Sequence, residues 1–130
     1  MTIAKTGLFK GKKMNKISLL FGIHMHQPVD NFGDAVDEAI ELCYKPFFET
    51  MVKYPDFKFS VHCSGWLLDK IRVEHPAIFS NMQTLSANGS IEWLSAGYYE
   101  PVLSAIPSND RRAQINKLNS YIHKHFKVKP

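Results

Sequence analysis

Two histidines separated by one residue are the first candidates for chemistry in this 130-residue chain. The segment His24-Met25-His26-Gln27-Pro28 follows an apolar run, Ile17 to Ile23, of the length and character of a strand buried on both faces. Side chains two positions apart on a strand point to the same side, so both imidazoles can enter one site while Met25 packs on the other side. Active sites of α/β folds lie at the carboxyl ends of parallel strands. The pair therefore predicts a site, and the alternative is two core histidines bonded to carbonyls.

A carboxylate within an apolar segment is the second candidate. Glu92 lies between Ile91 and Trp93 in a short predicted strand. A buried carboxylate is costly unless it is paired, so we expect Glu92 to bond an imidazole such as His26, or a sugar hydroxyl. The alternative is that Glu92 faces a solvent-lined gap.

Aromatic residues near the ends of the predicted strands are candidates for substrate contacts. Gly97-Tyr98-Tyr99-Glu100-Pro101 follows the third strand, and aromatic rings such as Tyr99 can stack on the apolar faces of sugars. The alternative is a loop plug in which Glu100 is salt-bridged. The Trp66 ring could either stack on a sugar or pack in the apolar core.

A metal site is a competing interpretation of the histidines. A His-x-His strand end can ligate zinc, and His62 at the end of the second predicted strand could be a third ligand. Because no Asp or Cys accompanies the pair at a comparable spacing, substrate hydrogen bonding is favoured and neither a metal nor a cofactor is expected. The sequence also has neither a glycine-rich phosphate loop nor a nucleophile elbow.

The elements that would position these residues alternate between strands and helices. Strands are predicted at Ile17–Ile23, Phe57–Cys63 and Ile91–Leu94 from apolar runs and period-two patterns. Helical spacing follows each strand, with apolar stripes at Val36, Ala39, Ile40, Cys43, Phe47 and Met51, then Leu67, Leu68, Ile71, Ile78, Met82 and Leu85, and then Ile115, Leu118, Ile122 and Phe126. Pro46 is expected to kink or restart the first helix, and Asn88-Gly89 to stop the second. Ser108, Asn109 or Asp110 is expected to cap the third.

This order predicts an α/β fold with a parallel sheet. Residues 1–13 are predicted to be an unstructured extension and residues 14–130 the folded part. Three parallel strands leave two outer edges exposed, so we expect the first three βα units of a larger, incomplete (β/α) barrel, which typically needs about 250 residues.

Composition and charge exclude several other classes. Hydrophobic residues make up 45% and charged residues 22%, which is typical of a folded chain, and no segment is long enough to span a membrane. All twelve acidic residues lie between 30 and 110, where only five basic residues occur, so a nucleic-acid partner is not expected. Two cysteines without framework spacing favour a cytoplasmic location, each as a small apolar packing residue.

Several of these segments in series resemble glycoside hydrolase family 57, in particular its α-amylase and 4-α-glucanotransferase members. The resemblance extends over about residues 14 to 126. The matching segments are Phe21-Gly22-Ile23-His24-Met25-His26-Gln27-Pro28, Asn31-Phe32, Tyr44-Lys45-Pro46-Phe47, His62-Cys63-Ser64-Gly65, Gly89-Ser90-Ile91-Glu92 and Gly97-Tyr98-Tyr99-Glu100-Pro101-Val102-Leu103.

The resemblance implies a seven-stranded (β/α) barrel that acts on α-glucans with retention of configuration. His24 and His26 match the first motif, which lines sugar subsites, and Glu92 matches the carboxylate of the second, in which Ser90 replaces a frequent Gln. Retaining glycosidases need two carboxyl groups about 5 to 5.5 Å apart. The family's nucleophile lies on a fourth strand and its acid/base residue later, so no catalytic residue is assigned and the 130-residue chain alone is expected to be inactive. The alternatives are a metal-dependent hydrolase or deacetylase of related fold, and a non-catalytic interaction module.

Overall fold

The computed structural model describes residues 17–130, so the extension predicted over residues 1–13 lies outside the described residues. Each of three strands is followed by one or more helices. In chain order the elements are β1 (Gly22–Met25), α1 (Gly33–Ala39), the π-helical turn η1 (Ile40–Tyr44), α2 (Lys45–Met51), β2 (Phe59–Cys63), α3 (Gly65–Glu74), α4 (Pro76–Ala87), β3 (Ile91–Leu94), the 3₁₀ turn η2 (Leu103–Ala105) and α5 (Ser108–Phe126).

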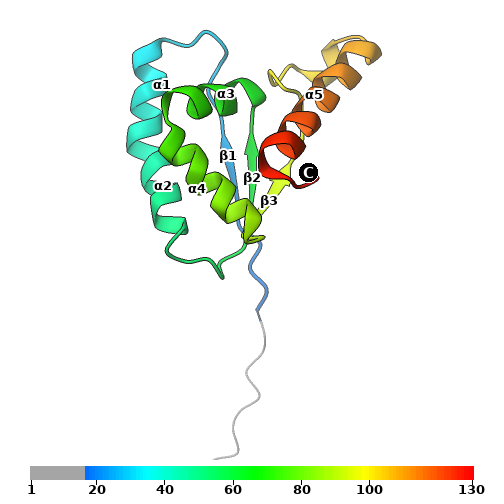
Figure 1. The fold of residues 1–130 in the computed structure, drawn as a ribbon. Coiled ribbons are helices and arrows are strands. Elements are labelled where there is room, and N and C mark those ends of the chain that lie inside the picture. The colour runs from blue at the N-terminus through cyan, green and yellow to red at the C-terminus, as the bar shows by residue number, and fades with distance from the viewer. Residues whose placement is uncertain (1–16) are drawn as a thin grey trace, which may run out of the picture.

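The strands form one parallel sheet in the order β1-β2-β3. In the register, His24 of β1 lies beside His62 of β2, and His62 lies beside Leu94 of β3. Figure 1 shows α3 and α4 crossing in front of the sheet, with α1 and α2 on the β1 side and α5 on the β3 side. The predicted α/β class and the three parallel βα units are confirmed.

One face of the sheet forms the apolar core with the helices. The period-two pattern of β2 puts Phe59, Val61 and Cys63 on this covered face, where each is at most 4% exposed. The helices contribute fully buried side chains, among them Phe48, Leu67, Leu68, Ile71, Met82, Leu85, Leu118 and Ile122. Trp93 of β3 stacks on Phe126 of α5 with ring centroids 4.3 Å apart. The buried Leu118, Ile122 and Phe126 agree with the stripe expected for α5, whereas Ile115 is only half-buried.

The first strand lies later in the chain than the apolar run predicted. It spans Gly22–Met25, whereas Ile17 and Leu20 are 92% and 98% exposed. The prediction assumed a strand covered on both faces, but only one face of this sheet is packed, and Met25 is the single buried residue of β1. The expected alternation of Met25 against the two histidines is confirmed: Met25 is 1% exposed and both histidines are exposed.

The helix around Pro46 is continuous but changes its phase. The π-helical turn η1 ends at Tyr44, directly before α2, and Pro46 occupies the first turn of α2. A π turn adds a residue to the helix, so the buried stripe moves to Tyr44 and Phe48. The predicted core position of Cys43 was therefore wrong, since this thiol is exposed, whereas Cys63 is buried as expected.

The remaining helix boundaries follow local chain chemistry. Gly89 has φ +67° directly after α4, which agrees with the predicted Asn88-Gly89 stop. The start of α5 differs from the prediction, because Pro107 is its N-cap and Ser108 is its first residue.

No helix within residues 17–130 is long and apolar enough to cross a membrane.

Candidate functional site

The second face of the sheet is open and polar. Positions that alternate with the buried ones place His24 on β1, Ser60 and His62 on β2, and Glu92 and Leu94 on β3 on this open face. His24, His62 and Leu94 lie side by side near the carboxyl ends of their strands. Imidazole groups thus gather at the end of the sheet where α/β folds place their sites.

Three imidazoles stack on one another at this end. The rings of His24 and His26 are 5.5 Å apart and inclined by 14°, and those of His24 and His62 are 4.8 Å apart and inclined by 13°. Nδ1 of His24 lies 2.7 Å from Nδ1 of His62, within hydrogen-bond distance if one of the two is protonated. The sequence placed His24 and His26 in the site, and the structure adds His62, which had been considered only as a metal ligand.

Glu100 is the carboxylate that meets these imidazoles. His26 Nδ1 donates to Glu100 Oε2 at 2.5 Å, and Nδ1 of His62 lies 3.3 Å from Glu100 Oε1. Nε2 of His24 is 3.9 Å from the same oxygen, and the Glu100 side chain is only 12% exposed. We call His24, His26, His62 and Glu100 the imidazole–carboxylate cluster.

The backbone of Glu100 explains how a loop residue reaches the strand ends. Its φ of +51° lies in the left-handed region, and its N–H donates to the Gly97 carbonyl at 3.0 Å to close a tight turn. A Cβ at Gly97 would lie 2.5 Å from Cδ of Pro101, so this turn needs a glycine there. The turn directs Glu100 toward the three imidazoles.

Tyr98 anchors the same loop to the start of α3. Gly65 N–H donates to the Tyr98 carbonyl at 2.8 Å, and a Cβ at Gly65 would lie 2.1 Å from the Tyr98 ring. The Tyr98 hydroxyl donates to Oδ2 of Asp69 at 2.5 Å. Burial alone would raise the pKa of Asp69, but this bond and one from Arg72 lower it below its ordinary value.

Tyr99 turns away from the imidazoles toward α5. Its hydroxyl accepts a hydrogen bond from Lys117 Nζ at 3.0 Å, and its N–H donates to Oε1 of Gln114 at 3.0 Å. The Lys117 ammonium also lies 4.0 Å from the centre of the Tyr98 ring. The Tyr99 ring remains 45% exposed, so its outer face is accessible.

A hydrogen-bonded chain behind His26 fixes its backbone. The Tyr44 hydroxyl donates to the His26 carbonyl at 3.1 Å, and Gln27 Nε2 donates to the Tyr44 hydroxyl at 3.4 Å. Asn31 Nδ2 in turn donates to Oε1 of Gln27 at 3.1 Å. Sequence reasoning missed these supports, because the predicted apolar stripe did not include Tyr44, which the phase change at η1 turns to the inner face.

The electrostatics of the cluster favour a neutral His62. Burial lowers the pKa of His62, and Glu100 opposes this effect while the two other imidazoles add to it. His62 Nε2 and Glu100 Oε1 are buried without a hydrogen-bond partner in the described chain. Because a carboxylate oxygen can only accept hydrogen bonds, Glu100 Oε1 is an unused acceptor beside the imidazoles.

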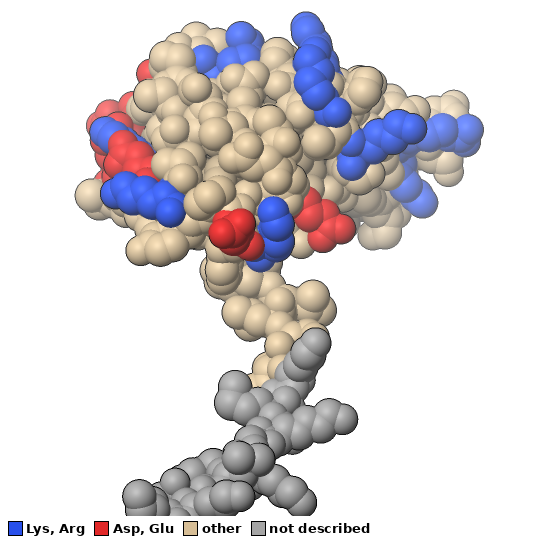
Figure 2. Space-filling view, turned by 60° about the horizontal axis from the view of Figure 1, so that its bottom comes forward, with Lys and Arg blue, Asp and Glu red and all other residues tan. Residues whose placement is uncertain are grey.

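Glu92 lies on the same open face but outside the cluster. Its Oε2 accepts a hydrogen bond from Ser60 Oγ at 3.0 Å, and its side chain is exposed. Glu92 does not pair with His26, because His26 bonds Glu100, and its exposure agrees with the alternative in which Glu92 faces solvent. Glu92 lines a cavity of about 530 Å³ toward the amino ends of the strands, with Leu19, Leu20, Phe21, Gly22, Lys58, Phe59, Ser60, Gly89, Ser90, Ile91 and Leu94. Figure 2 shows acidic and basic side chains next to each other at this end of the molecule, close to where the chain enters the folded part.

Trp66 and Ser90 occupy positions that the sequence left open. Trp66 is half-buried at the start of α3 and packs against the apolar core. Ser90 is buried, and its hydroxyl donates to the Pro55 carbonyl at 2.7 Å. This bond ties the start of β3 to the turn before β2.

Two groups among residues 17–130 bring three metal-ligating atoms within 4.8 Å of one another. One group is His24, His62 and Glu100, and the other is Asp37, Glu74 and His75 on the helical side. In the second group, Lys70 Nζ lies 3.0 Å from Asp37 and 2.5 Å from Glu74, so an ammonium already balances both carboxylates.

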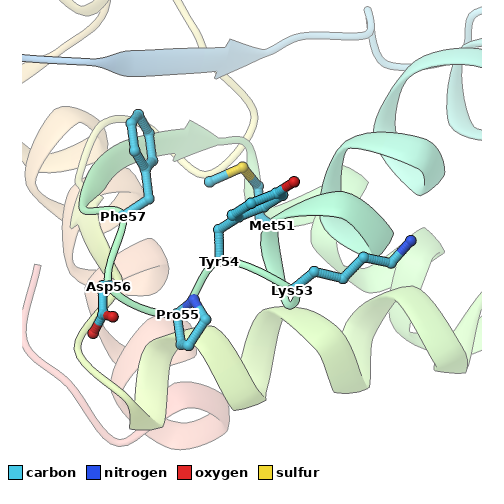
Figure 3. A pocket seen from close by; sticks show the side chains of 6 residues that line it. All are labelled: Met51, Lys53, Tyr54, Pro55, Asp56 and Phe57. Atoms are coloured by element: carbon cyan, nitrogen blue, oxygen red, sulfur yellow. The ribbon is translucent and has the colours of Figure 1, made fainter.

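A separate hollow lies at the other end of β2. It has a volume of about 530 Å³ and is formed by one continuous segment, Met51, Lys53, Tyr54, Pro55, Asp56 and Phe57. Figure 3 shows the Tyr54 ring and Met51 beside each other, with the Lys53 side chain extending away from them. This hollow precedes β2, whereas His62 is near the end of that strand, so the two are not parts of one site.

The cluster can bind a polyhydroxylated ligand through complementary groups. A carboxylate accepts hydrogen bonds, and each neutral imidazole offers one donor and one acceptor. Such alternation suits sugar hydroxyls, which both donate and accept. The cluster can therefore form hydrogen bonds with sugar hydroxyls, and His26 holds the Glu100 carboxylate in place.

The chain is similar to known proteins of one family. Residues 20–130 match the model of "Glycosyl hydrolase family 57". The chain is 44% identical over 109 residues to "Alpha-amylase 1" of Dictyoglomus thermophilum, covering 84% of this chain and 16% of that protein. It is also 44% identical over 108 residues to the "4-alpha-glucanotransferase" of Thermococcus kodakarensis, covering 83% and 16%.

A solved structure agrees with the sequence matches. The crystal structure of 4-alpha-glucanotransferase from Thermococcus litoralis superposes with a TM-score of 0.78 and 44% identity, over 81% of this chain and 16% of that one. The chain thus spans about one sixth of the length of these relatives, and its three βα units correspond to their N-terminal part. Because the family match extends over most of its length, this chain belongs to glycosyl hydrolase family 57.

Proposed function

We propose that the imidazole–carboxylate cluster is part of an α-glucan site in a retaining glycoside hydrolase or 4-α-glucanotransferase. The observation that supports this most is the convergence of His24, His26 and Glu100 at the carboxyl ends of the strands in a chain of this family. The names of the relatives supply the substrate class.

The candidate contacts differ in their support. The cluster offers His24, His26 and Glu100 directly to a sugar, and the exposed face of Tyr99 lies next to Glu100 in the chain. Glu92 would contact a sugar unit nearer the amino ends of the strands, where its carboxylate lines the open cavity. Trp66 is the weakest candidate, because the core already occupies much of its surface.

We further propose that the 130-residue chain binds glucan without cleaving it. Retaining cleavage needs one carboxylate as nucleophile and another as acid/base. Glu100 is bonded to His26 and Glu92 to Ser60, and each arrangement suits ligand recognition. Binding by residues 14–130 as the N-terminal part of a larger catalytic barrel is consistent with these contacts.

We also propose that the protein is cytoplasmic and has no nucleic-acid partner. The two cysteines are free, which suits the reducing conditions of a cytoplasm. The excess of acidic residues between 30 and 110 disfavours a nucleic-acid partner.

The test is titration of the 130-residue chain with maltoheptaose, followed by calorimetry and by amide NMR shifts. We expect shifts near the cluster and no release of reducing sugar. Glu100→Gln should weaken binding about tenfold or more, since a hydrogen bond to a charged group contributes about 1.5–3 kcal/mol.

Glu49→Gln is the matched control, because this exposed glutamate lies on α2 outside the cluster. Equal affinity of Glu100→Gln and the parent chain would contradict the proposed site. Turnover that Glu92→Gln abolishes would overturn the expectation that the chain does not cleave glucan.

A further inference from the structure

A cluster of two imidazoles and a carboxylate from three separate segments also has the donor atoms of a transition-metal site. His24 comes from β1, His62 from β2 and Glu100 from the loop after β3, and one ligand atom of each lies within 4.8 Å of the others. Imidazole nitrogen and carboxylate oxygen are ordinary Zn²⁺ ligands.

We propose that His24, His62 and Glu100 bind one Zn²⁺ ion and that this ion excludes glucan from the same place. The separation of 3.3 Å between His62 Nδ1 and Glu100 Oε1 is close to the edge of a zinc tetrahedron with bonds of about 2.0–2.1 Å. The orphaned Glu100 Oε1 supplies an unused ligand atom at the centre of the cluster.

One adjustment is needed before all three groups can bind. Nδ1 of His24 and Nδ1 of His62 are 2.7 Å apart, which is too close for two ligands of one ion. His24 can provide this movement, because its side chain is 59% exposed, whereas those of His62 and Glu100 are 14% and 12% exposed. We therefore expect His62 and Glu100 to stay in place, while the exposed His24 ring moves to bind the ion.

His26 is not one of the three proposed ligands, but it orients one of them, Glu100. Its Nδ1–H holds Oε2 of Glu100 at 2.5 Å and leaves Oε1 turned toward the other two imidazoles. A hydrogen bond that orients a ligating carboxylate typically accounts for about 10–100-fold in metal affinity. His26 is thus a positioning residue for the ion.

The group Asp37, Glu74 and His75 provides an internal comparison. It meets the same distance criterion, but Lys70 lies 3.0 Å from Asp37 and 2.5 Å from Glu74. An ammonium at this distance repels a cation and occupies the oxygen atoms that the cation would need. We therefore expect no zinc there.

The experiment uses the tag-free 130-residue chain after treatment with chelator and its removal. Zn²⁺ is titrated by calorimetry with no sugar present, and Co²⁺ is titrated by visible absorption, which reports the coordination geometry. We expect one ion per chain. Both His24→Gln and His62→Gln should weaken binding by more than the about 10–100-fold expected for His26→Gln.

His75→Gln is the matched control and should bind zinc as the parent chain does. His24 is exposed, so His24→Gln tests the site even if His62→Gln does not fold, which circular dichroism will show. No binding by the parent chain, or undiminished binding by His24→Gln, overturns the site, as does loss of binding in a folded His75→Gln chain. The zinc measurement does not depend on the proposed function, because no glucan is present.

A second titration tests the exclusion of glucan. With one equivalent of Zn²⁺ bound, the affinity for maltoheptaose should fall, and chelator should restore it. If glucan binds equally well with and without bound zinc, the ion does not occupy the sugar site.

Discussion

The two faces of the three-stranded sheet have the same strands but opposite physical roles. On the covered face, Val61, Cys63 and Trp93 are at most 2% exposed and pack against helices. On the open face, His24, Glu92 and Leu94 are exposed. Because side chains alternate along a strand, every residue that stabilises the core places its neighbours on the open face.

This difference separates stability from recognition. The covered face buries apolar area, which is the main favourable term in folding. The open face holds polar groups whose hydrogen bonds compete with water and add little stability. Substitutions on the two faces should therefore affect different measurements.

The largest expected difference between the faces comes from truncating one leucine on each side. Leu68 of α3 is fully buried in the core on the covered face of the sheet, so Leu68→Ala should lower the free energy of unfolding by about 2–5 kcal/mol. Leu94 is 45% exposed on the open face, and Leu94→Ala should change it by about 0.5 kcal/mol or less. Urea denaturation followed by circular dichroism measures both values, and similar losses for the two variants would contradict the division into a covered core and an open face.

A smaller effect is expected from pH. Burial lowers the pKa of His125 below its ordinary value near 6.5, with a further contribution from Lys124 and Arg72 against an opposing one from Asp69. As pH falls below about 6.5, the unfolded chain takes up a proton more readily than the folded chain, so the free energy of unfolding decreases. The His125 ring packs against the Tyr121 ring on the helical side, with ring centroids 4.4 Å apart.

His125→Phe should therefore reduce the slope of stability against pH between about pH 5 and 6.5. The slope that remains should come partly from His62 on the open face, whose pKa is also lowered by burial. His123→Gln, an exposed position on the same helix, is the control. An unchanged slope in His125→Phe would show that the helical side does not contribute to acid sensitivity.

The smallest expected effect concerns the hydrogen bond from Ser60 to Glu92. Ser60→Ala removes the donor to an exposed carboxylate, so the free energy of unfolding should change by about 0.5 kcal/mol or less. In contrast, Ser90→Ala removes a buried hydroxyl that donates to the Pro55 carbonyl, and should lower it by about 1–3 kcal/mol. Thermal unfolding of the two variants gives the comparison, and a larger loss for Ser60→Ala would contradict it.

The sequence predicted the covered face better than the open one. The alternation of Phe59, Val61 and Cys63 and the bounds of β3 follow from local patterns, and the structure agrees with both. The start of β1 was wrong because an apolar run does not reveal whether both faces of a sheet will be covered. The buried position of Tyr44 was missed because a π turn changes the helical period without a signal in the sequence pattern.

The site was predictable in part. The spacing of His24 and His26 placed both imidazoles on the correct face. The carboxylate that they meet could not be selected by strand position alone, since Glu92 lies in a strand and Glu100 reaches the cluster only through a left-handed loop conformation. The contact between His24 and His62 depends on the register of two strands, which the sequence does not specify.

The backbone conformation of Glu100 has an energetic cost. At φ +51° a residue with a side chain has a conformational energy higher than that of glycine by roughly 1 kcal/mol or more. Glu100→Gly would relax the turn yet remove the only acidic group that touches the imidazoles in the described residues. A laboratory selection for thermal robustness alone would therefore favour discarding this glutamate, whereas selection for ligand recognition would retain it.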